Sequence, residues 1–151
     1  MNLEPNAVLS KSCSLGVSEN GSTERLTVYF DGSCPLCSLE IRHYASEKGS
    51  DALSFVDVSA PEASVGPGLT TDQAMKRFHV RLPNGRLVSG ARAFALIWET
   101  LPRWRWASKL AKLPGAIPVL EFSYKAFLPL RGMLSRLAAR VGVQAIRVKT
   151  E

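Results

Sequence analysis

The chain has 151 residues with a formal net charge of +6, and 46% of its residues are hydrophobic and 21% charged. That length suffices for one domain with its own hydrophobic core, and the composition is ordinary for a globular protein. Three cysteines are too few for the disulfide scaffold of a small secreted protein. No stretch reaches the ~20 consecutive apolar residues that a membrane-spanning helix requires.

The N-terminal segment is expected to stay outside the folded domain. Residues 1–24 are rich in Ser, Asn and Glu and show no hydrophobic period, which predicts a disordered tail. The segment lacks the basic start and apolar core of a secretory signal, so we expect a cytoplasmic protein. Cys13 lies in this tail and is interpreted as an incidental thiol, with disulfide resolution or intermolecular pairing as the alternative.

A strand followed by a dithiol opens the folded part. Leu26–Phe30 is a β-rich, mostly apolar run, typical of a strand in the centre of a sheet. A turn follows, and Cys34-Pro35-Leu36-Cys37 then begins a helix predicted to extend to about Glu47. Proline suits the first helical position, where its missing N–H costs nothing.

The spacing of Cys34 and Cys37 is the most informative feature of the chain. Two intervening residues let the sulfurs close a small ring, and a helix N-terminus stabilises a thiolate. Helical spacing places Cys37 on the inward face with Ile41 and Tyr44, and Cys34 at the helix start, nearer to solvent. Cys34 is therefore predicted to attack a disulfide and Cys37 to resolve the mixed disulfide.

Asp31 lies three residues before Cys34 and has two interpretations. As a functional residue it would accept the proton of Cys37 during exchange, which requires a carboxylate near the sulfur. As a structural residue, Asp31 would stabilise the turn or, like its neighbour Ser33, cap the first helical turn, which is worth about 1 kcal/mol. Both interpretations stay open at this point.

The dithiol itself has two other interpretations. In one, the two thiolates supply half of the ligands of a zinc or copper site. Zinc usually takes four Cys or His ligands, and the only further Cys or His residues of the chain are Cys13, His43 and His79. The dithiol would otherwise be an inert buried pair. A further alternative for the whole chain is a module in which the dithiol is only regulatory and the basic C-terminal helices dock a partner or an anionic membrane. His43 is too far along the helix to touch Cys34, and His79 is expected to point outward from its strand.

The next elements alternate between strand and helix. They are a strand at Leu53–Val58, a loop at Ala60–Leu69, a short helix at Thr71–Lys76, strands at Phe78–Leu82 and Arg86–Val88, and a helix at Ala91–Leu101. The first two strands are expected to be parallel because a helix separates them. Asn84-Gly85 is a strong hairpin-turn signal. The order βαβαββα predicts a thioredoxin-like α/β domain with a mixed sheet over residues 25–101.

A basic helical extension, expected to pack on the domain, follows over residues 102–151. Its helices are predicted to break at Pro114, Pro118 and Pro129. Residues 101–151 carry a net charge of +8 and residues 1–100 carry −2, an asymmetry that indicates an anionic partner or surface. Aromatic and basic residues alternate in 103–113, which would suit peripheral contact with an anionic membrane. The alternative is a helix packed on the domain, and no nucleic-acid-binding motif accompanies the charge.

Val28–Cys37 resembles the signature of the DCC family of predicted thiol–disulfide oxidoreductases, and Asp31, Cys34 and Cys37 match the residues that name the family. Weaker blocks follow in the family's order at Phe55–Asp57, Phe78–Val80, Asn84–Arg86, Ser89–Ala91, Ala93-Phe94, Leu113–Gly115 and Tyr124. The resemblance covers residues 26–131 and implies thiol–disulfide exchange on a thioredoxin-like fold.

The chain departs from the expected patterns at two places. Family members tend to have an Ala-Arg-Asn-Arg type segment where this chain has Ala126–Arg131. Thioredoxins carry a proline before the hairpin strand, whereas Gln73–Arg77 has none, so their substrate docking is not carried over. No nucleotide-binding G-x-G-x-x-G follows a strand. We therefore expect no cofactor, and a redox partner that is a protein or a small thiol.

Overall fold

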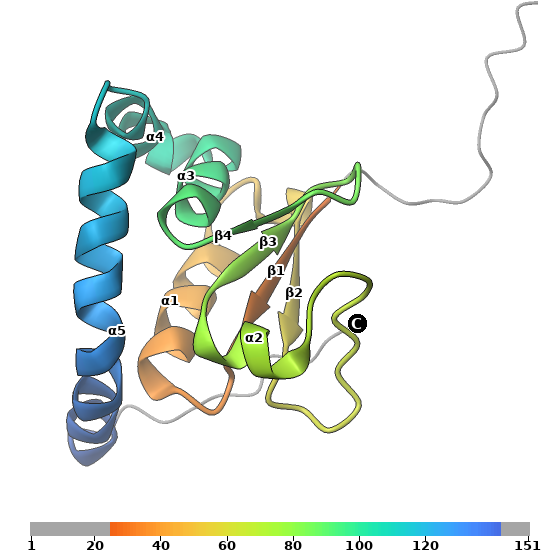
Figure 1. Ribbon diagram of the computed structural model, residues 1–151, viewed down its shortest axis with the longest axis vertical. Coiled ribbons are helices and arrows are strands. Elements are labelled where there is room, and N and C mark those ends of the chain that lie inside the picture. Colours follow the sequence, from red (N-terminus) through yellow and green to blue (C-terminus); the bar gives the residue numbers. More distant parts are fainter. Residues whose placement is uncertain (1–24, 143–151) are drawn as a thin grey trace, which may run out of the picture.

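The computed structural model describes residues 25–142; the predicted tail, Cys13 and residues 143–151 lie outside this range (Figure 1). The strands are β1 (Leu26–Phe30), β2 (Leu53–Asp57), β3 (His79–Arg81) and β4 (Leu87–Ser89). The helices are α1 (Pro35–Ser46), α2 (Thr71–Lys76), α3 (Ala91–Thr100), α4 (Arg105–Ala111) and α5 (Ala116–Arg140), with single 3₁₀ turns at Ser50–Ala52 and Pro102–Trp104. The order from β1 to α3 is the predicted βαβαββα.

The four strands form one mixed sheet in the order β2-β1-β3-β4. β1 and β2 are parallel, with Val28 beside Phe55, as the intervening helix α1 requires. β3 runs antiparallel to β1 and to β4, and places Val80 between Val28 and Val88. This sheet, with its flanking helices, confirms the predicted thioredoxin-like fold.

The two faces of the sheet carry separate apolar clusters. Side chains alternate along β1, so Val28 and Phe30 face α1 and α3, and Tyr29 faces the opposite side. The first cluster is the main core, made of Val28, Phe30, Ile41, Tyr44, Leu53, Val80, Ala93, Ile97 and Leu101. The second is smaller and lies under α2 and the loop before it, with Tyr29, Val58, Leu69 and Ala74.

His79 corrects a prediction from the sequence. It faces away from the main core, but it is only 9% exposed, so the expected outward position is wrong. The reason is that the second cluster covers the face on which His79 and its β1 neighbour Tyr29 lie. Its Nδ1 lies 2.6 Å from the carbonyl oxygen of Arg77, which supplies a partner for the buried ring.

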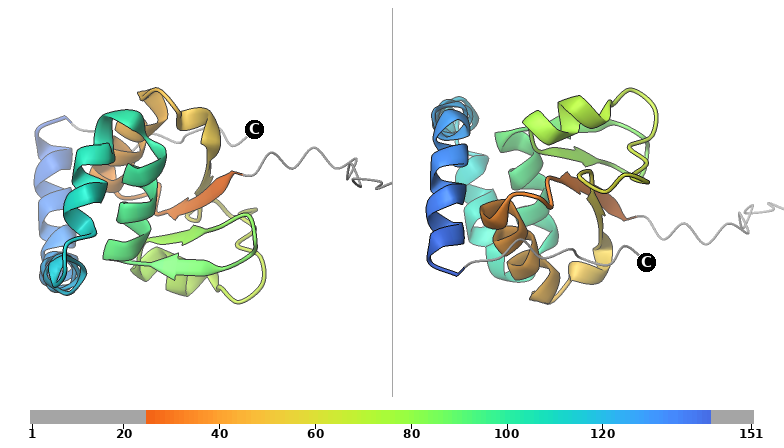
Figure 2. Two further views of the ribbon diagram at one scale, coloured as in Figure 1. Left: turned by 90° about the horizontal axis from the view of Figure 1, so that it is seen from above. Right: turned by 90° about the horizontal axis from the view of Figure 1, so that it is seen from below.

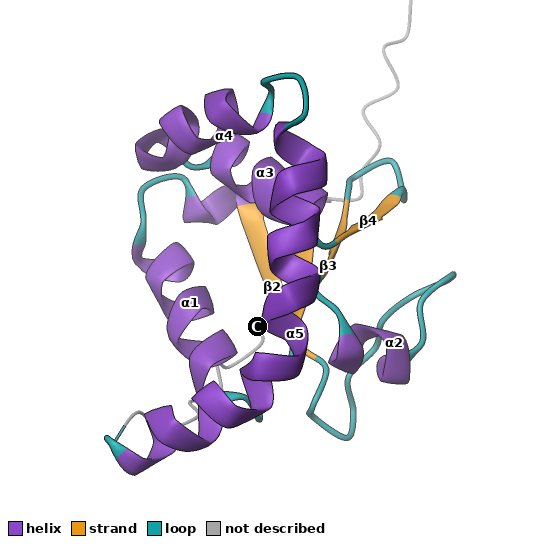
Figure 3. Ribbon diagram, turned by 60° about the vertical axis from the view of Figure 1, so that its left-hand side comes forward, coloured by secondary structure: helices purple, strands orange, loops and turns teal. Residues whose placement is uncertain are grey.

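Helix α5 forms an outer layer over α1 and α3, on the side of these helices away from the sheet (Figures 1 and 2). Figure 3 shows it passing in front of the sheet. Glu121 forms an ion pair with Arg77 and accepts a hydrogen bond from the backbone N–H of Ala91 at 3.0 Å. The hydroxyl of Tyr124 accepts the N–H of Phe78 at 2.9 Å. These contacts fix the N-terminal half of α5 to the start of β3 and α3.

The predicted proline breaks are right at one position and wrong at two. Pro114 lies between α4 and α5, as expected. Pro118 lies inside α5 without breaking it because it is the third residue, where the N–H has no intrahelical partner. Pro129 also lies inside α5, where contacts on both sides of it hold the helix against the domain.

The aromatic residues of the 103–113 segment divide between core and surface. Trp104 packs on Trp98 and Tyr44, with ring centroids 6.2 and 6.0 Å apart, whereas Trp106 is 60% exposed. One tryptophan therefore anchors α4 and the other faces outward. Within residues 25–142, none of the helices has the length and apolar character needed to cross a membrane.

Candidate functional site

The dithiol lies where β1 ends and α1 begins. Cys34 is the N-cap of α1, Pro35 is the first helical residue, and the Cys34 sulfur accepts the backbone N–H of Cys37 at 3.3 Å. The spacing of three residues is the spacing between an N-cap and the N–H that it satisfies. The cap is therefore Cys34 itself, and the predicted capping by Asp31 or Ser33 is wrong.

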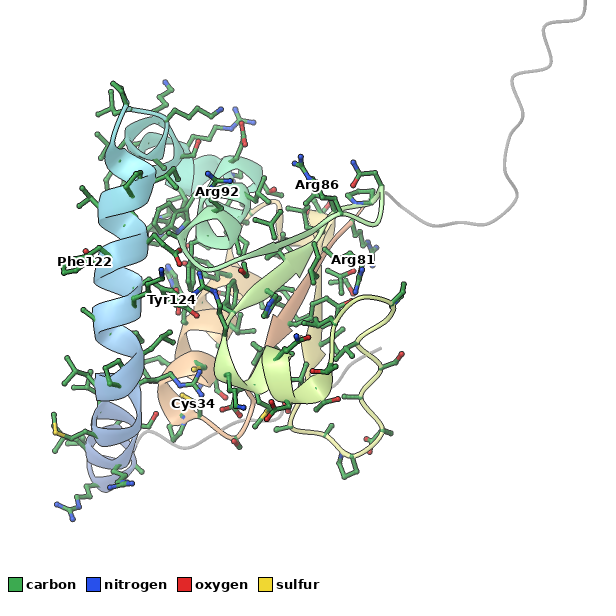
Figure 4. The ribbon with its side chains drawn as sticks, viewed as in Figure 1. Cys34, Arg81, Arg86, Arg92, Phe122 and Tyr124 are labelled. Atoms are coloured by element: carbon green, nitrogen blue, oxygen red, sulfur yellow. The ribbon has the colours of Figure 1, made fainter. Side chains whose placement is uncertain are left out.

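The two sulfurs are in contact. The Cys37 thiol donates to the Cys34 Sγ across 2.7 Å, and both cysteines are reduced. Ser135 of α5 places its hydroxyl 3.0 Å from the same Cys34 sulfur. Because α5 covers this point, Cys34 is only 6% exposed and Cys37 is partly exposed, so the prediction that Cys34 lies nearer to solvent is wrong. Figure 4 shows Cys34 beside α5.

Three hydrogen-bond donors surround the Cys34 sulfur and stabilise its thiolate. The thiol of Cys37 has the largest effect, and the Ser135 hydroxyl, the Cys37 backbone N–H and the positive charge of Arg131 add to it against the opposing effect of burial. Together they lower the pKa of Cys34 from 9.0 to about 5. The same hydrogen bond and burial raise the pKa of Cys37, and the charges of Cys34 and Asp31 raise it further. Because the two pKa shifts have opposite signs, Cys34 ionises at a pH at which Cys37 keeps its proton.

Asp31 is a buried turn residue with partners on both carboxylate oxygens. Its Oδ1 accepts the backbone N–H of Ser33 at 3.0 Å and the Ser33 hydroxyl at 2.5 Å. Its Oδ2 accepts a hydrogen bond from Arg131 at 3.0 Å, and the same guanidinium nitrogen donates to the Met75 carbonyl at 3.2 Å. The ion pair joins the start of α1 to α5 across one hundred residues of sequence.

Arg131 and Ser135 are site residues that the sequence reasoning missed. Both lie on α5, one helical turn apart, and face the dithiol. The available signal was the segment Ala126–Arg131, which differs from the family pattern but ends in the arginine that contacts Asp31.

A second buried carboxylate, Asp57 at the end of β2, holds the turn in place. Its Oδ1 accepts the N–H of Gly32 at 2.9 Å, together with the N–H and hydroxyl of Ser59 at 2.9 and 2.6 Å. The hydroxyl of Ser38 on α1 donates to the Gly32 carbonyl at 3.0 Å. Gly32 is thereby bound on both its N–H and its carbonyl, which fixes the backbone that presents Cys34.

A cavity of about 40 Å³ adjoins Cys37 and is lined by Asp31, Glu40, Tyr124 and Arg131 among others. It is large enough for a water molecule and offers polar partners for one. Cys37 and Asp31 both line this cavity, so a water molecule in it would lie beside both residues.

Neither histidine lies at the dithiol. His43 packs on Trp104 with ring centroids 5.7 Å apart, as expected for a packing residue, and His79 is held by Arg77. Among the residues that the structure describes, no three His, Cys, Asp or Glu side chains are grouped to hold a metal ion. A metal bound by Cys34 and Cys37 would need further ligands from outside residues 25–142.

Comparison with known proteins gave a match to one family, over a span that contains all the residues of the site. A family model described as DCC1-like thiol-disulfide oxidoreductase matches residues 28–137, a span that includes Asp31, both cysteines, Arg131 and Ser135. Comparisons with curated proteins and with solved structures gave no match.

Proposed function

The chain belongs to the DCC1-like thiol-disulfide oxidoreductase family, and we propose that it exchanges disulfides through Cys34 and Cys37. The observation that carries the proposal is the set of donors around the Cys34 sulfur, which lowers its pKa to about 5. At neutral pH Cys34 is then a thiolate, the form that attacks disulfides. An inert buried pair would lack such stabilisation of the charge.

The first step is attack of the Cys34 thiolate on a substrate disulfide. A bond forms between Cys34 and one substrate sulfur, the substrate disulfide breaks, and the other substrate sulfur leaves as a thiolate. Ser135 contacts the Cys34 sulfur, so its hydroxyl must move aside before a substrate disulfide reaches Cys34.

In the second step Cys37 loses its proton and attacks the Cys34 sulfur. The second substrate thiolate leaves, and the protein holds a Cys34–Cys37 disulfide. The raised pKa of Cys37 means that this proton needs an acceptor. Asp31 serves as the acceptor, through a water molecule in the adjoining cavity.

A protein or small-thiol partner returns the two electrons to the disulfide and closes the cycle. The cytoplasmic location expected from the sequence is part of this proposal, because the glutathione pool of that compartment would keep the dithiol reduced.

Alkylation of the reduced protein tests the low pKa of Cys34. The rate of labelling of Cys34 by iodoacetamide should rise about tenfold per pH unit below pH 5 and become constant above about pH 6, because the thiolate is then fully formed. Peptide mass spectrometry would assign the label, and Cys37 should stay unlabelled in this range. A rate that kept rising to pH 8 would contradict the proposal.

Ser135→Ala is the matched variant for this measurement. It removes one donor to the Cys34 sulfur and leaves the two from Cys37, so the midpoint of labelling should move to higher pH. An unchanged midpoint would mean that the Ser135 hydroxyl has no part in stabilising the thiolate.

Replacing Asp31 tests its role as proton acceptor. Asp31→Asn keeps the oxygen that accepts from Ser33 but cannot take a proton, so decay of the mixed disulfide should slow by about 10²-fold. Rapid acid quenching and mass spectrometry would follow the decay, while attack by Cys34 should be unimpaired.

Arg131→Met is the control, because it removes the same ion pair and leaves the carboxylate. It should slow resolution much less than Asp31→Asn does. Equal slowing by both variants would assign Asp31 a purely structural role through the ion pair.

A further inference from the structure

Helix α5 has an apolar stripe on the face turned away from the domain. We define the outer stripe as Val119, Phe122, Leu130, Met133 and Leu137 together with Val141, the C-cap residue of α5, each between 49% and 78% exposed. Its members follow at three- or four-residue intervals, with Ala126 in the single wider gap, so they share one helical face. Figure 4 shows Phe122 pointing away from the domain and Tyr124 pointing toward it.

The outer stripe is not needed to hold α5 on the domain. The opposite face of the helix makes those contacts, through Glu121, Tyr124, Arg131 and Ser135. None of the helix's residues is buried, although the helix is 25 residues long. An apolar face of this extent on a protein surface marks an interaction site.

Positive charge borders the outer stripe. Lys125, Arg136 and Arg140 each lie three positions after a stripe residue, and all three are exposed. Neither Lys125 nor Arg136 pairs with a carboxylate of the described residues. The only acidic residue of segment 102–142 is Glu121, which faces the domain and pairs with Arg77.

Helix α4 extends the surface at the N-terminal end of α5. Trp106, Leu110 and Leu113 are each more than half exposed and line one groove with Val119. The exposed Lys109 lies on the same short helix. Exposed apolar, aromatic and basic side chains therefore run from α4 along the length of α5.

We propose that this surface binds an anionic membrane, with α5 lying in the plane of the headgroups. An apolar face bordered by Lys and Arg, with Trp at the boundary, is the pattern of interfacial helices. The stripe follows α5, which contains 25 residues or about 37 Å of helix at 1.5 Å per residue, and the charged residues beside it are basic, which suits an extended anionic surface. A second copy of the chain would bring like charges together.

Sedimentation with vesicles tests the proposal on the full reduced chain. The protein should bind phosphatidylcholine vesicles that contain about one third phosphatidylglycerol, and bind pure phosphatidylcholine at least about tenfold more weakly, because each basic residue near an anionic surface adds severalfold to affinity. High salt should weaken the binding. The Cys34→Ser protein should bind vesicles as well as the unchanged chain does. The vesicle test therefore does not depend on disulfide exchange, and either proposal can be wrong without the other.

Two pairs of variants separate the apolar and the charged parts. Phe122→Ser with Met133→Ser should lower vesicle binding at least about tenfold, whereas Leu39→Ser, at an exposed apolar site on α1 outside the stripe, should not. Lys125→Glu with Arg136→Glu should have a similar effect. Arg86→Glu is its control, since Arg86 lies on the hairpin far from α5 (Figure 4).

Three results would overturn the proposal. They are no binding to anionic vesicles, equal binding to neutral and anionic vesicles, and binding that the Phe122 and Met133 changes leave intact. A dimer in analytical ultracentrifugation that these two changes convert to monomer would assign the outer stripe to a second copy instead.

Discussion

Cys34→Ser should abolish disulfide exchange, lowering the rate of reduction of a peptide disulfide by roughly 10³-fold or more, because a hydroxyl does not ionise at neutral pH. Cys37→Ser should still attack, since the serine hydroxyl can donate to the Cys34 sulfur in place of the thiol. It should then stop as a mixed disulfide, because the second sulfur is missing.

Mass spectrometry of the intact protein distinguishes the two cysteines. The Cys37→Ser protein should gain the mass of one substrate half, and a reducing agent should release it. The Cys34→Ser protein should gain none. The opposite pattern, with the adduct on Cys37, would reverse the assignment of attacking and resolving residues.

Gly32→Ala should destabilise the protein by about 2–4 kcal/mol, which is a fall in melting temperature of roughly 5–15 °C for a chain of this size. A Cβ at Gly32 would overlap the Asp57 carboxylate. Asp57 would have to move, and a buried charge would lose its hydrogen bond to the Gly32 N–H and its place beside Ser59.

Gly132→Ala is the matched control. Gly132 lies inside α5, and a Cβ there meets no atom within 4 Å. The change should stabilise the protein by roughly 0.5–1 kcal/mol, because alanine favours the helix. The melting temperature should therefore fall for Gly32→Ala and rise for Gly132→Ala. A Gly32→Ala protein that melted like the unchanged chain would mean that Asp57 does not fix the turn.

The variants at Gly32 and Ser135 change two different supports of Cys34. Gly32 and Asp57 hold the backbone that presents Cys34, and Ser135 reaches its sulfur from α5. Each contact joins elements that are distant in sequence, so we expect the reactivity of Cys34 to depend on the docking of α5 as well as on the local turn.

The sequence by itself determined the elements whose signals are local. The apolar run before the turn predicted β1, the spacing of Cys34 and Cys37 with Pro35 predicted the start of α1, and Asn84-Gly85 predicted the hairpin. Helix and turn signals act over three or four residues, so they can be read from the chain. The family match over residues 28–137 confirms the resemblance carried by this same local motif.

Only the tertiary structure decided what surrounds the dithiol. Arg131 and Ser135 reach Asp31 and Cys34 from about one hundred residues away, and no local period specifies that contact. The same docking keeps α5 continuous through Pro129, and packing of α2 and its loop on the second face of the sheet buries His79. Burial energy is shared among residues distant in sequence, so local propensity and spacing cannot reveal which of them meet.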